Sequence, residues 1–148
     1  MIPSVSIAVY ANIGNDVKVL LHKRANTGFR DGYYDLPRGH VESDEMPVSA
    51  AVRELKEETN LGVNADDLEL FHIRTNELDT PGCPYLYMFF RVEKGKCRGR
   101  YGINEPEKCD DMKFFDKNDL PKPITQSSRV AIKHLNSKAV LFSKTITP

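Results

Sequence analysis

Runs of apolar residues alternate with short polar segments along this chain, and the runs have the lengths and compositions of β-strands. Segments 4–13 and 17–24 are rich in Val, Ile and Leu, and Gly14-Asn15-Asp16 lies between them, so they predict a hairpin. Segments 68–77 and 84–93, joined by a loop that contains Pro and Gly, predict a second antiparallel pair. Shorter strands are expected at 33–37, 112–116 and 139–146.

The segment from Met46 to Asn60 has a helical period instead. Pro47 suits a first helical turn, and Asp44 and Glu45 supply the negative charge that a helix N-terminus favours. At about 100° per residue, an apolar arc and an acidic arc lie roughly 120° apart. The apolar arc is Val48, Ala51, Val52 and Leu55, and the acidic arc is Glu54, Glu57 and Glu58. Asn60 is expected to end the helix in left-handed backbone.

A second helix is expected over 125–136, where Val130, Ile132 and Leu135 are apolar and Thr125 or Ser127 is available as a cap. Strands before and after a central helix, followed by a late helix, predict an α+β fold. The chain has 148 residues and 40% hydrophobic content, which predicts a single domain over 1–148.

The three glutamates on one helical face are a candidate metal site. Like charges three or four residues apart destabilise a helix by about 0.2 to 0.5 kcal/mol per pair, and a divalent cation reverses that effect. Hard cations such as Mg²⁺ take oxygen ligands and keep several waters, so a few carboxylates suffice. Ala50, one turn before Glu54, is expected to leave room beside the carboxylates. The alternative is a solvated helix in which Arg53 and Lys56 neutralise the glutamates.

The spacing of the whole stretch favours the metal site. Gly39 is followed after five residues by Glu45, and after seven more by Arg-Glu-Leu-Lys-Glu-Glu-Thr-Asn-Leu at 53–61. This stretch resembles the Nudix box of the MutT-like Nudix hydrolases, G-x(5)-E-x(7)-R-E-U-x-E-E-x-G-U, where U is bulky and aliphatic. Asn60 replaces the last glycine, and Asn tolerates left-handed backbone. The approach at 36–42 is also similar, with Arg38 where Gly or Lys is more common.

The resemblance implies an alpha/beta/alpha sandwich around a mixed β-sheet and a Mg²⁺ cofactor for which Mn²⁺ can substitute. It implies that Glu57 and Glu58 bind the metal, joined by the backbone carbonyl of Arg38 or Gly39. It further implies that Glu54 is a ligand or accepts a proton from water. Arg53 would orient a neighbouring glutamate, and Glu45 would be either part of the site or a helix-capping acid.

Further site residues are expected outside the box. The acidic segment 104–111 precedes a strand, and Nudix hydrolases often draw a distal glutamate from this region, for which Glu107 is preferred and Glu105 is the alternative. Arg24 begins a polar loop that is expected to line a substrate pocket. Gln126 lies near the start of the second helix, where nucleotide-specific members place a side chain that reads the base.

The resemblance favours cleavage of a nucleoside triphosphate, for example an oxidised purine nucleotide such as 8-oxo-dGTP, into monophosphate and pyrophosphate. The alternative substrates are ADP-ribose, another nucleotide sugar or a dinucleoside polyphosphate. A different class of function is a non-catalytic nucleotide-binding regulator. The intact glutamates of the box argue against that class.

Charge and hydrophobicity narrow the range of partners. Lys plus Arg equals Asp plus Glu at 21 each, so no overall basic field favours a nucleic acid polymer or an acidic membrane surface. No apolar run approaches the roughly 20 residues of a membrane span, and the first residues carry no basic leader, so a cytoplasmic protein is expected. A small-molecule nucleotide is the expected partner. Dimers are common among the proteins it resembles, so a homodimer is a further expectation.

Overall fold

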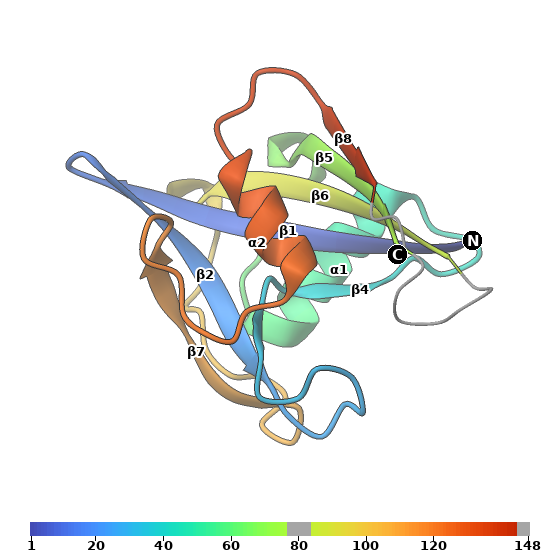
Figure 1. Ribbon diagram of the computed structural model, residues 1–148, viewed down its shortest axis with the longest axis horizontal. Coiled ribbons are helices and arrows are strands. Elements are labelled where there is room, and N and C mark those ends of the chain that lie inside the picture. The colour runs from blue at the N-terminus through green and yellow to red at the C-terminus, as the bar shows by residue number, and fades with distance from the viewer. Residues whose placement is uncertain (77–83, 145–148) are drawn as a thin grey trace.

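Eight strands and two α-helices form in residues 1–76 and 84–144, the parts of the chain that this computed structural model describes (Figure 1). The strands are β1 (Ile2–Ile13), β2 (Asp16–Arg24), β3 (Tyr34–Asp35), β4 (Arg38–His40), β5 (Glu69–Asn76), β6 (Tyr85–Glu93), β7 (Cys109–Asp116) and β8 (Leu141–Lys144). The helices are α1 (Pro47–Thr59) and α2 (Gln126–Lys133), with 3₁₀ turns at Ala65–Asp67 and Lys94–Lys96. All eight strands belong to one mixed sheet, with α2 in front of β1 and α1 behind it, which confirms the expected α+β sandwich.

Strand β1 organises the sheet because both of its edges are used. On one edge it pairs in parallel with β6 along most of its length. On the other edge, β2 pairs with its last residues from Tyr10 to Ile13, and β4 pairs antiparallel with its first residues, where Val5 is opposite Gly39. Strand β4 therefore occupies the part of the edge that β2 leaves open, which brings its backbone beside α1.

The two faces of β1 contribute to two separate apolar cores. Side chains alternate along a strand, so Val5, Ile7 and Val9 pack on the α1 side while Ala8 packs on the α2 side. Leu55 of α1 is fully buried in the first core. Burying one such side chain contributes about 1.5 to 3 kcal/mol. The apolar face of α1 is thus fixed on the sheet, and its acidic face points away from this core.

The elements that are defined by residues close together in the sequence match their predictions. The hairpin is confirmed, with Ile13 opposite Asp16, and β5 pairs antiparallel with β6 as expected. Helix α1 begins at Pro47 and ends at Thr59, and its C-cap residue Asn60 has a φ of 68°, the left-handed conformation expected there. The connection at 77–83 lies outside the described residues. No helix in the described ranges is both long enough and apolar enough to span a membrane.

Other elements differ from their predictions because distant residues define them. Strand β4 was not predicted, since it is a strand only through its pairing with β1. Strand β7 begins at Cys109, three residues early, because Cys109 pairs with Arg24 of β2. The expectation for Ala50 is wrong: it is fully buried in the core between α1 and the sheet and does not open space beside the glutamates.

The C-terminal elements are shorter than predicted. Helix α2 ends at Lys133 instead of 136, and the backbone N–H groups of His134 and Leu135 bond three residues back, which tightens the last turn. Thr125 occupies the N-cap position of α2, but its side chain makes no capping bond. Strand β8 covers Leu141–Lys144, and the remainder of the expected strand lies beyond the described part of the chain.

A buried histidine pair makes the stability of the fold depend on pH. His72 of β5 is fully buried and stacks on His134, with ring centroids 5.4 Å apart. Burial, and then the neighbouring His134, lower the pKa of His72 from 6.5 to about 4. The unfolded chain therefore takes up a proton near pH 6.5 while the folded chain does not.

We expect the free energy of unfolding to fall as the pH drops from about 6.5 towards 4, by about 1.4 kcal/mol per unit of pKa depression. Urea unfolding at pH 7.5, 6 and 5 would measure it. His72→Gln should flatten this dependence. Equal slopes in the variant and the original chain would contradict the assignment to His72.

Candidate active site

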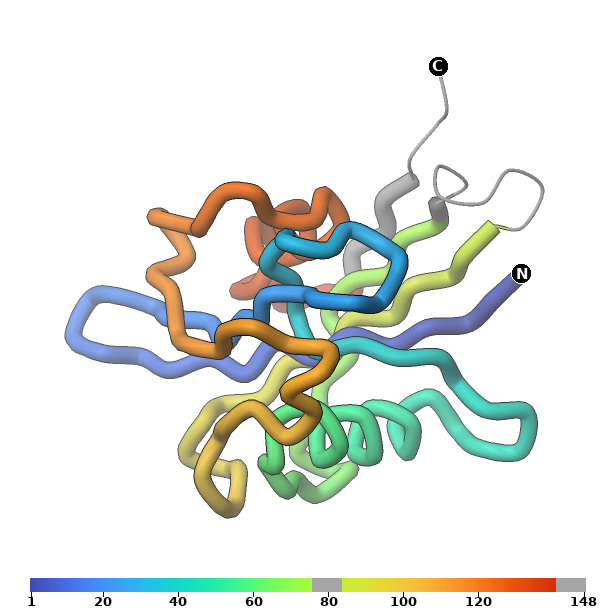
Figure 2. The backbone as a smooth tube through the Cα atoms, turned by 90° about the horizontal axis from the view of Figure 1, so that it is seen from below, coloured from blue at the N-terminus to red at the C-terminus, as the bar shows by residue number. Residues whose placement is uncertain are grey.

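A cavity of about 720 Å³ opens between the acidic face of α1, strand β4, strand β6 and the segments that flank β2 and β7. Its acidic lining consists of Glu54, Glu57, Glu58 and Glu105, and its basic lining includes Arg24, Arg38 and Lys108. Aromatic side chains of Phe29, Tyr85 and Tyr87 line it as well. Figure 2 looks at this side of the molecule and shows the segment after β2 beside the segment before β7, with α1 below them. Acidic, basic and aromatic groups thus share one concave surface.

Gly39 is required by space rather than by backbone conformation. A Cβ atom added at Gly39 would lie 2.0 Å from Cδ of Glu54, far closer than any real contact. The Glu54 carboxylate therefore lies directly against the backbone of β4. Any larger residue at position 39 would displace this carboxylate from the cavity.

Glu58 and Glu54 carry negative charge that their surroundings compensate only in part. The backbone N–H of Arg38 donates to Oε2 of Glu58 at 2.9 Å. Burial, and then the charge of Glu54, raise the pKa of Glu58 well above its usual value. Burial likewise raises the pKa of Glu54, and the carboxylates of Glu57 and Glu105 add to the effect. A cation bound among these groups would relieve the excess charge.

Arg53 holds the other side of the acidic face. Its Nη1 donates to Glu54 at 2.8 Å and to Glu57 at 3.2 Å, and its Nη2 donates to the carbonyl of His40 at 3.1 Å. The Nε and Nη2 atoms of Arg53 also bond both carboxylate oxygens of Glu45. Glu45 in turn accepts the backbone N–H of Glu42 and does not cap α1. Glu45 therefore serves to orient Arg53.

Of the two candidate backbone carbonyls, that of Arg38 is directed towards the glutamates. The carbonyl of Pro37 accepts from the N–H of Ile7, and the N–H of Val41 donates to the carbonyl of Pro3, so alternate residues of this segment face β1. The carbonyl of Gly39 also accepts the hydroxyl of Ser4 at 3.0 Å. Arg38 lies between these residues, so its N–H and C=O point away from β1, and the N–H reaches Glu58. The geometry thus favours Arg38 over Gly39 as an oxygen ligand.

The donor set fits Mg²⁺ without forming a dense cluster. Within residues 1–76 and 84–144, no three His, Cys, Asp or Glu side chains converge as a ready-made metal site. Mg²⁺ does not need such a cluster, because it is usually bound by one or two carboxylates together with waters and substrate phosphates. Two mutually repelling carboxylates beside the Arg38 carbonyl supply hard oxygen ligands of this kind.

The site residues expected outside the box divide into two groups. Glu105 lines the cavity, whereas Glu107 is exposed and contributes its backbone carbonyl to Asn26 at 2.9 Å. The geometry thus favours the alternative, Glu105, over Glu107. Arg24 lines the cavity as expected. Gln126 is exposed at the first turn of α2 and does not belong to the cavity lining.

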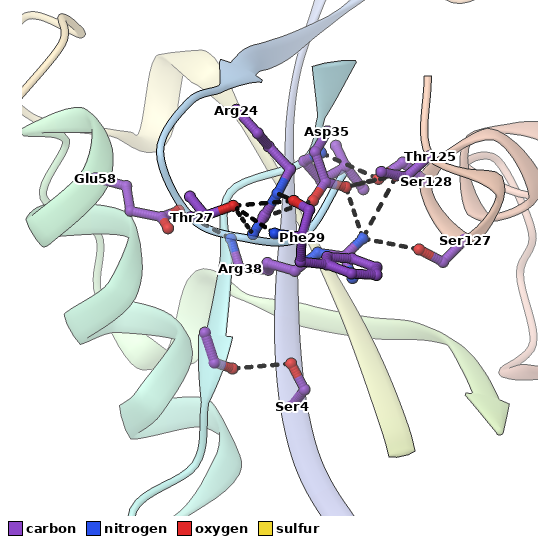
Figure 3. A network of polar contacts seen from close by, with 12 residues as sticks. Ser4, Arg24, Thr27, Phe29, Asp35, Arg38, Glu58, Thr125, Ser127 and Ser128 are labelled. Atoms are coloured by element: carbon purple, nitrogen blue, oxygen red, sulfur yellow. Dashed lines mark hydrogen bonds and ion pairs between the residues drawn. The ribbon is translucent and has the colours of Figure 1, made fainter. Parts of the chain in front are cut away.

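Sequence reasoning missed a buried polar network beneath the cavity. Asp35 of β3 is fully buried and bonds Arg24, Arg38 and two hydroxyl side chains next to or within α2 (Figure 3). An aspartate between tyrosine and leucine in an otherwise apolar strand was the available signal. Its partners in α2 lie about 90 residues away in the chain and gave no local signal.

Comparisons with known proteins agree with the geometry. The chain matches the NUDIX domain model over residues 2–135. It is 36% identical over 118 residues to the ADP-ribose pyrophosphatase of Methanocaldococcus jannaschii, an alignment that covers 79% of this chain and 65% of that protein. This chain therefore spans slightly less than two thirds of that relative.

Solved structures share the fold. A MutT NUDIX hydrolase from Burkholderia pseudomallei superposes with a TM-score of 0.76 at 23% identity, covering 90% of this chain and 97% of that one. The NUDIX domain of Shewanella oneidensis NrtR, solved in complex with ADP ribose, superposes with a TM-score of 0.70 at 18% identity, covering 92% and 86%.

The contact between Gly39 and Glu54 can be tested by a single methyl group. We expect Gly39→Ala to displace the Glu54 carboxylate and to lower metal-dependent turnover about 100-fold, the effect of a misplacement of roughly 1 Å. Gly95→Ala is the matched control, because no atom lies within 4 Å of a Cβ added there. Steady-state kinetics of both variants would measure the difference. Equal turnover in the two would contradict the importance of this contact.

Proposed function

Because the chain belongs to the NUDIX domain family, whose model it matches over residues 2–135, we propose that it is a metal-dependent hydrolase of phosphoanhydride bonds in nucleotides. The observation that carries the proposal is the arrangement of Glu54, Glu57 and Glu58 in one cavity with the cationic Arg24 and Lys108. Carboxylates recruit a divalent cation, and cations attract phosphates. The alternative of a merely solvated charged helix does not account for Glu54 and Glu58, whose raised pKa values mark charge that solvent does not screen.

Each residue has a distinct role in the proposed reaction. Glu57, Glu58 and the Arg38 carbonyl would hold Mg²⁺, with Glu105 as the distal carboxylate in place of Glu107. When bound, the ion neutralises phosphate charge and supplies an activated water. Mn²⁺ has similar oxygen preferences and would substitute.

Glu54 would accept the proton of the attacking water on a carboxylate oxygen. Its ion pair with Arg53 fixes the orientation of that carboxylate. Burial raises the pKa of Glu54, which makes it a stronger base than an exposed glutamate. Arg24, already bonded to Asp35, Thr27 and the carbonyl of Phe29, would present a fixed positive charge to the diphosphate.

ADP-ribose is the first substrate candidate. The relative with 36% identity is named an ADP-ribose pyrophosphatase. The sequence motifs alone favoured a nucleoside triphosphate, and this similarity supports considering ADP-ribose first. A volume of about 720 Å³ lies within the range of small-molecule sites. Tyr85 lines the cavity and is only partly buried, so its ring, which stacks on that of the buried Tyr87 with centroids 5.5 Å apart, offers an aromatic surface for a base or ribose.

A nucleoside triphosphate is the second candidate. It is favoured by the acidic segment 104–111 before an aromatic strand, which resembles triphosphate-hydrolysing Nudix enzymes. The two candidates differ in their products. ADP-ribose gives AMP and ribose 5-phosphate, whereas a triphosphate gives a monophosphate and pyrophosphate.

Product analysis after incubation with Mg²⁺ and each substrate would decide between them. We expect AMP and ribose 5-phosphate from ADP-ribose, and loss of turnover by orders of magnitude in Glu57→Gln, because one metal-binding charge is removed. Glu69→Gln, in an exposed pair with Arg91 on β6, is the control and should keep its turnover. Pyrophosphate from a triphosphate would favour the second candidate. Nucleotide binding without any product would favour a non-catalytic regulator and would refute the proposal.

Metal binding should depend on pH through Glu58. Since burial and Glu54 raise the pKa of Glu58, the metal-free carboxyl holds its proton to higher pH than an exposed glutamate, and a cation must displace that proton. We therefore expect the rise in melting temperature caused by about 5 mM Mg²⁺ to be larger at pH 8 than at pH 6. Glu58→Gln should lose this pH dependence. A pH-independent rise in the original chain would count against Glu58 as a ligand.

A further inference from the structure

The buried carboxylate of Asp35, which has no direct part in the proposed chemistry, is the centre of a polar network (Figure 3). Its Oδ1 accepts from Arg38 Nη2 at 2.6 Å, and its Oδ2 accepts from Arg24 Nη1 at 3.2 Å. The hydroxyls of Thr125 and Ser128 also donate to Oδ1, at 2.7 and 2.6 Å. Asp35 thus joins β2, the start of β4 and the start of α2.

The network keeps Asp35 ionised inside the protein. Burial alone raises the pKa of a carboxyl group, but the positive charge of Arg38, followed by those of His22 and Arg24, outweighs it and holds the pKa of Asp35 below its usual value. A buried charge that is compensated this fully forms a fixed point in the fold. The side chains that bond to Asp35 are therefore held in defined positions.

Arg38 links the Asp35 network to the acidic face of α1. At its side-chain end, Nη2 donates to Asp35 and to Ser127 at 2.7 Å, and the guanidinium lies over the ring of Tyr87 at 5.2 Å. At its main-chain end, the N–H donates to Glu58 at 2.9 Å. One residue therefore connects the start of α2 to a carboxylate of the candidate metal site.

Glu58 needs such a restraint because Glu54 repels it. The two glutamates are four residues apart on one face of α1, so their like charges drive the carboxylates apart. The hydrogen bond from Arg38 opposes that movement. The carbonyl of Arg38 moves together with the same peptide segment, so the network would fix two oxygen ligands at once.

We propose that Asp35 and Arg38 are positioning residues that couple the start of α2 to the metal-binding edge of α1 through the main chain of Arg38. The inference rests on the proposed function, since it assigns Glu58 and the Arg38 carbonyl to a metal ion. Arg38 lines the cavity, yet its side chain serves as an internal anchor, and Arg24 and Lys108 are left to meet the substrate phosphates.

The test compares two arginines that both anchor α2. Arg38→Lys keeps the charge but replaces the rigid guanidinium, whose Nη2 donates to both Asp35 and Ser127, by a flexible chain that ends in a single ammonium group. The control, Arg91→Lys, changes an arginine whose Nη1 donates to the carbonyls of Leu135 at 2.7 Å and Ser137 at 2.6 Å, at the far end of α2. Both substitutions remove anchoring bonds, but only the first lies next to Glu58.

Mn²⁺ binding to the substrate-free protein would be measured by calorimetric titration, together with the urea midpoint of each variant. We expect the dissociation constant for Mn²⁺ to rise about tenfold in Arg38→Lys, the lower range for residues that orient metal ligands. Asp35→Asn should behave in the same way. Ser127→Ala removes a single acceptor, should fold even where Asp35→Asn does not, and should shift the constant in the same direction by a smaller factor. Arg91→Lys should bind Mn²⁺ as the original chain does.

Unchanged Mn²⁺ affinity in Arg38→Lys and Ser127→Ala, with a loss of stability similar to that of Arg91→Lys, would overturn the inference and leave the network purely structural. Failure of the proposed function has a different signature. In that case the original chain itself would bind no Mn²⁺, or would bind it equally well after Glu58→Gln. A weaker Mn²⁺ affinity in the Arg38, Asp35 and Ser127 variants, with no change in Arg91→Lys, would establish the coupling.

Discussion

The close approach between the backbone of β4 and the acidic face of α1 is the contact on which the site depends. It requires a glycine at position 39, because a Cβ there would overlap the Glu54 carboxyl group. It also requires β4 to be held in the sheet, which its pairing with β1 provides. The apolar core beneath α1 fixes the helix from the other side. Carboxylates that repel one another are thereby kept together by the packing of the rest of the fold.

Two groups of buried charges in this protein follow opposite rules. Around Asp35, two arginines and two hydroxyls satisfy one carboxylate, so nothing further is needed from outside the chain. Around Glu54 and Glu58, negative charge exceeds the compensation available, as their raised pKa values indicate. Arg53 lessens the excess by bonding three glutamates, Glu45 among them. The compensated group is suited to structure, and the under-compensated group is suited to binding a cation.

The two groups are adjacent because Arg38 belongs to both. Its side chain completes the Asp35 network and its main chain contacts Glu58. The arginine at this position therefore has a structural explanation. A longer side chain reaches the hydroxyl of Ser127 on α2, which a glycine could not. Neighbouring cations on the flanking segments remain directed at the cavity.

The sequence by itself determined the elements whose geometry is local. Helical periodicity placed the glutamates on one face of α1, Asn60 ended the helix in left-handed backbone, and the turn before Asp16 defined the hairpin. These features depend on residues within a few positions of one another, so short-range patterns contain them.

Only the tertiary structure decided the features that join distant segments. It placed Glu105 in the cavity lining and Glu107 in solvent, because the loop before β7 turns the two side chains in different directions. It left Gln126 exposed. It also formed the bond between Ser128 and Asp35 across 93 residues of chain. A linear pattern carries no record of such contacts, because they arise only when the sheet brings β3, β4 and α2 together.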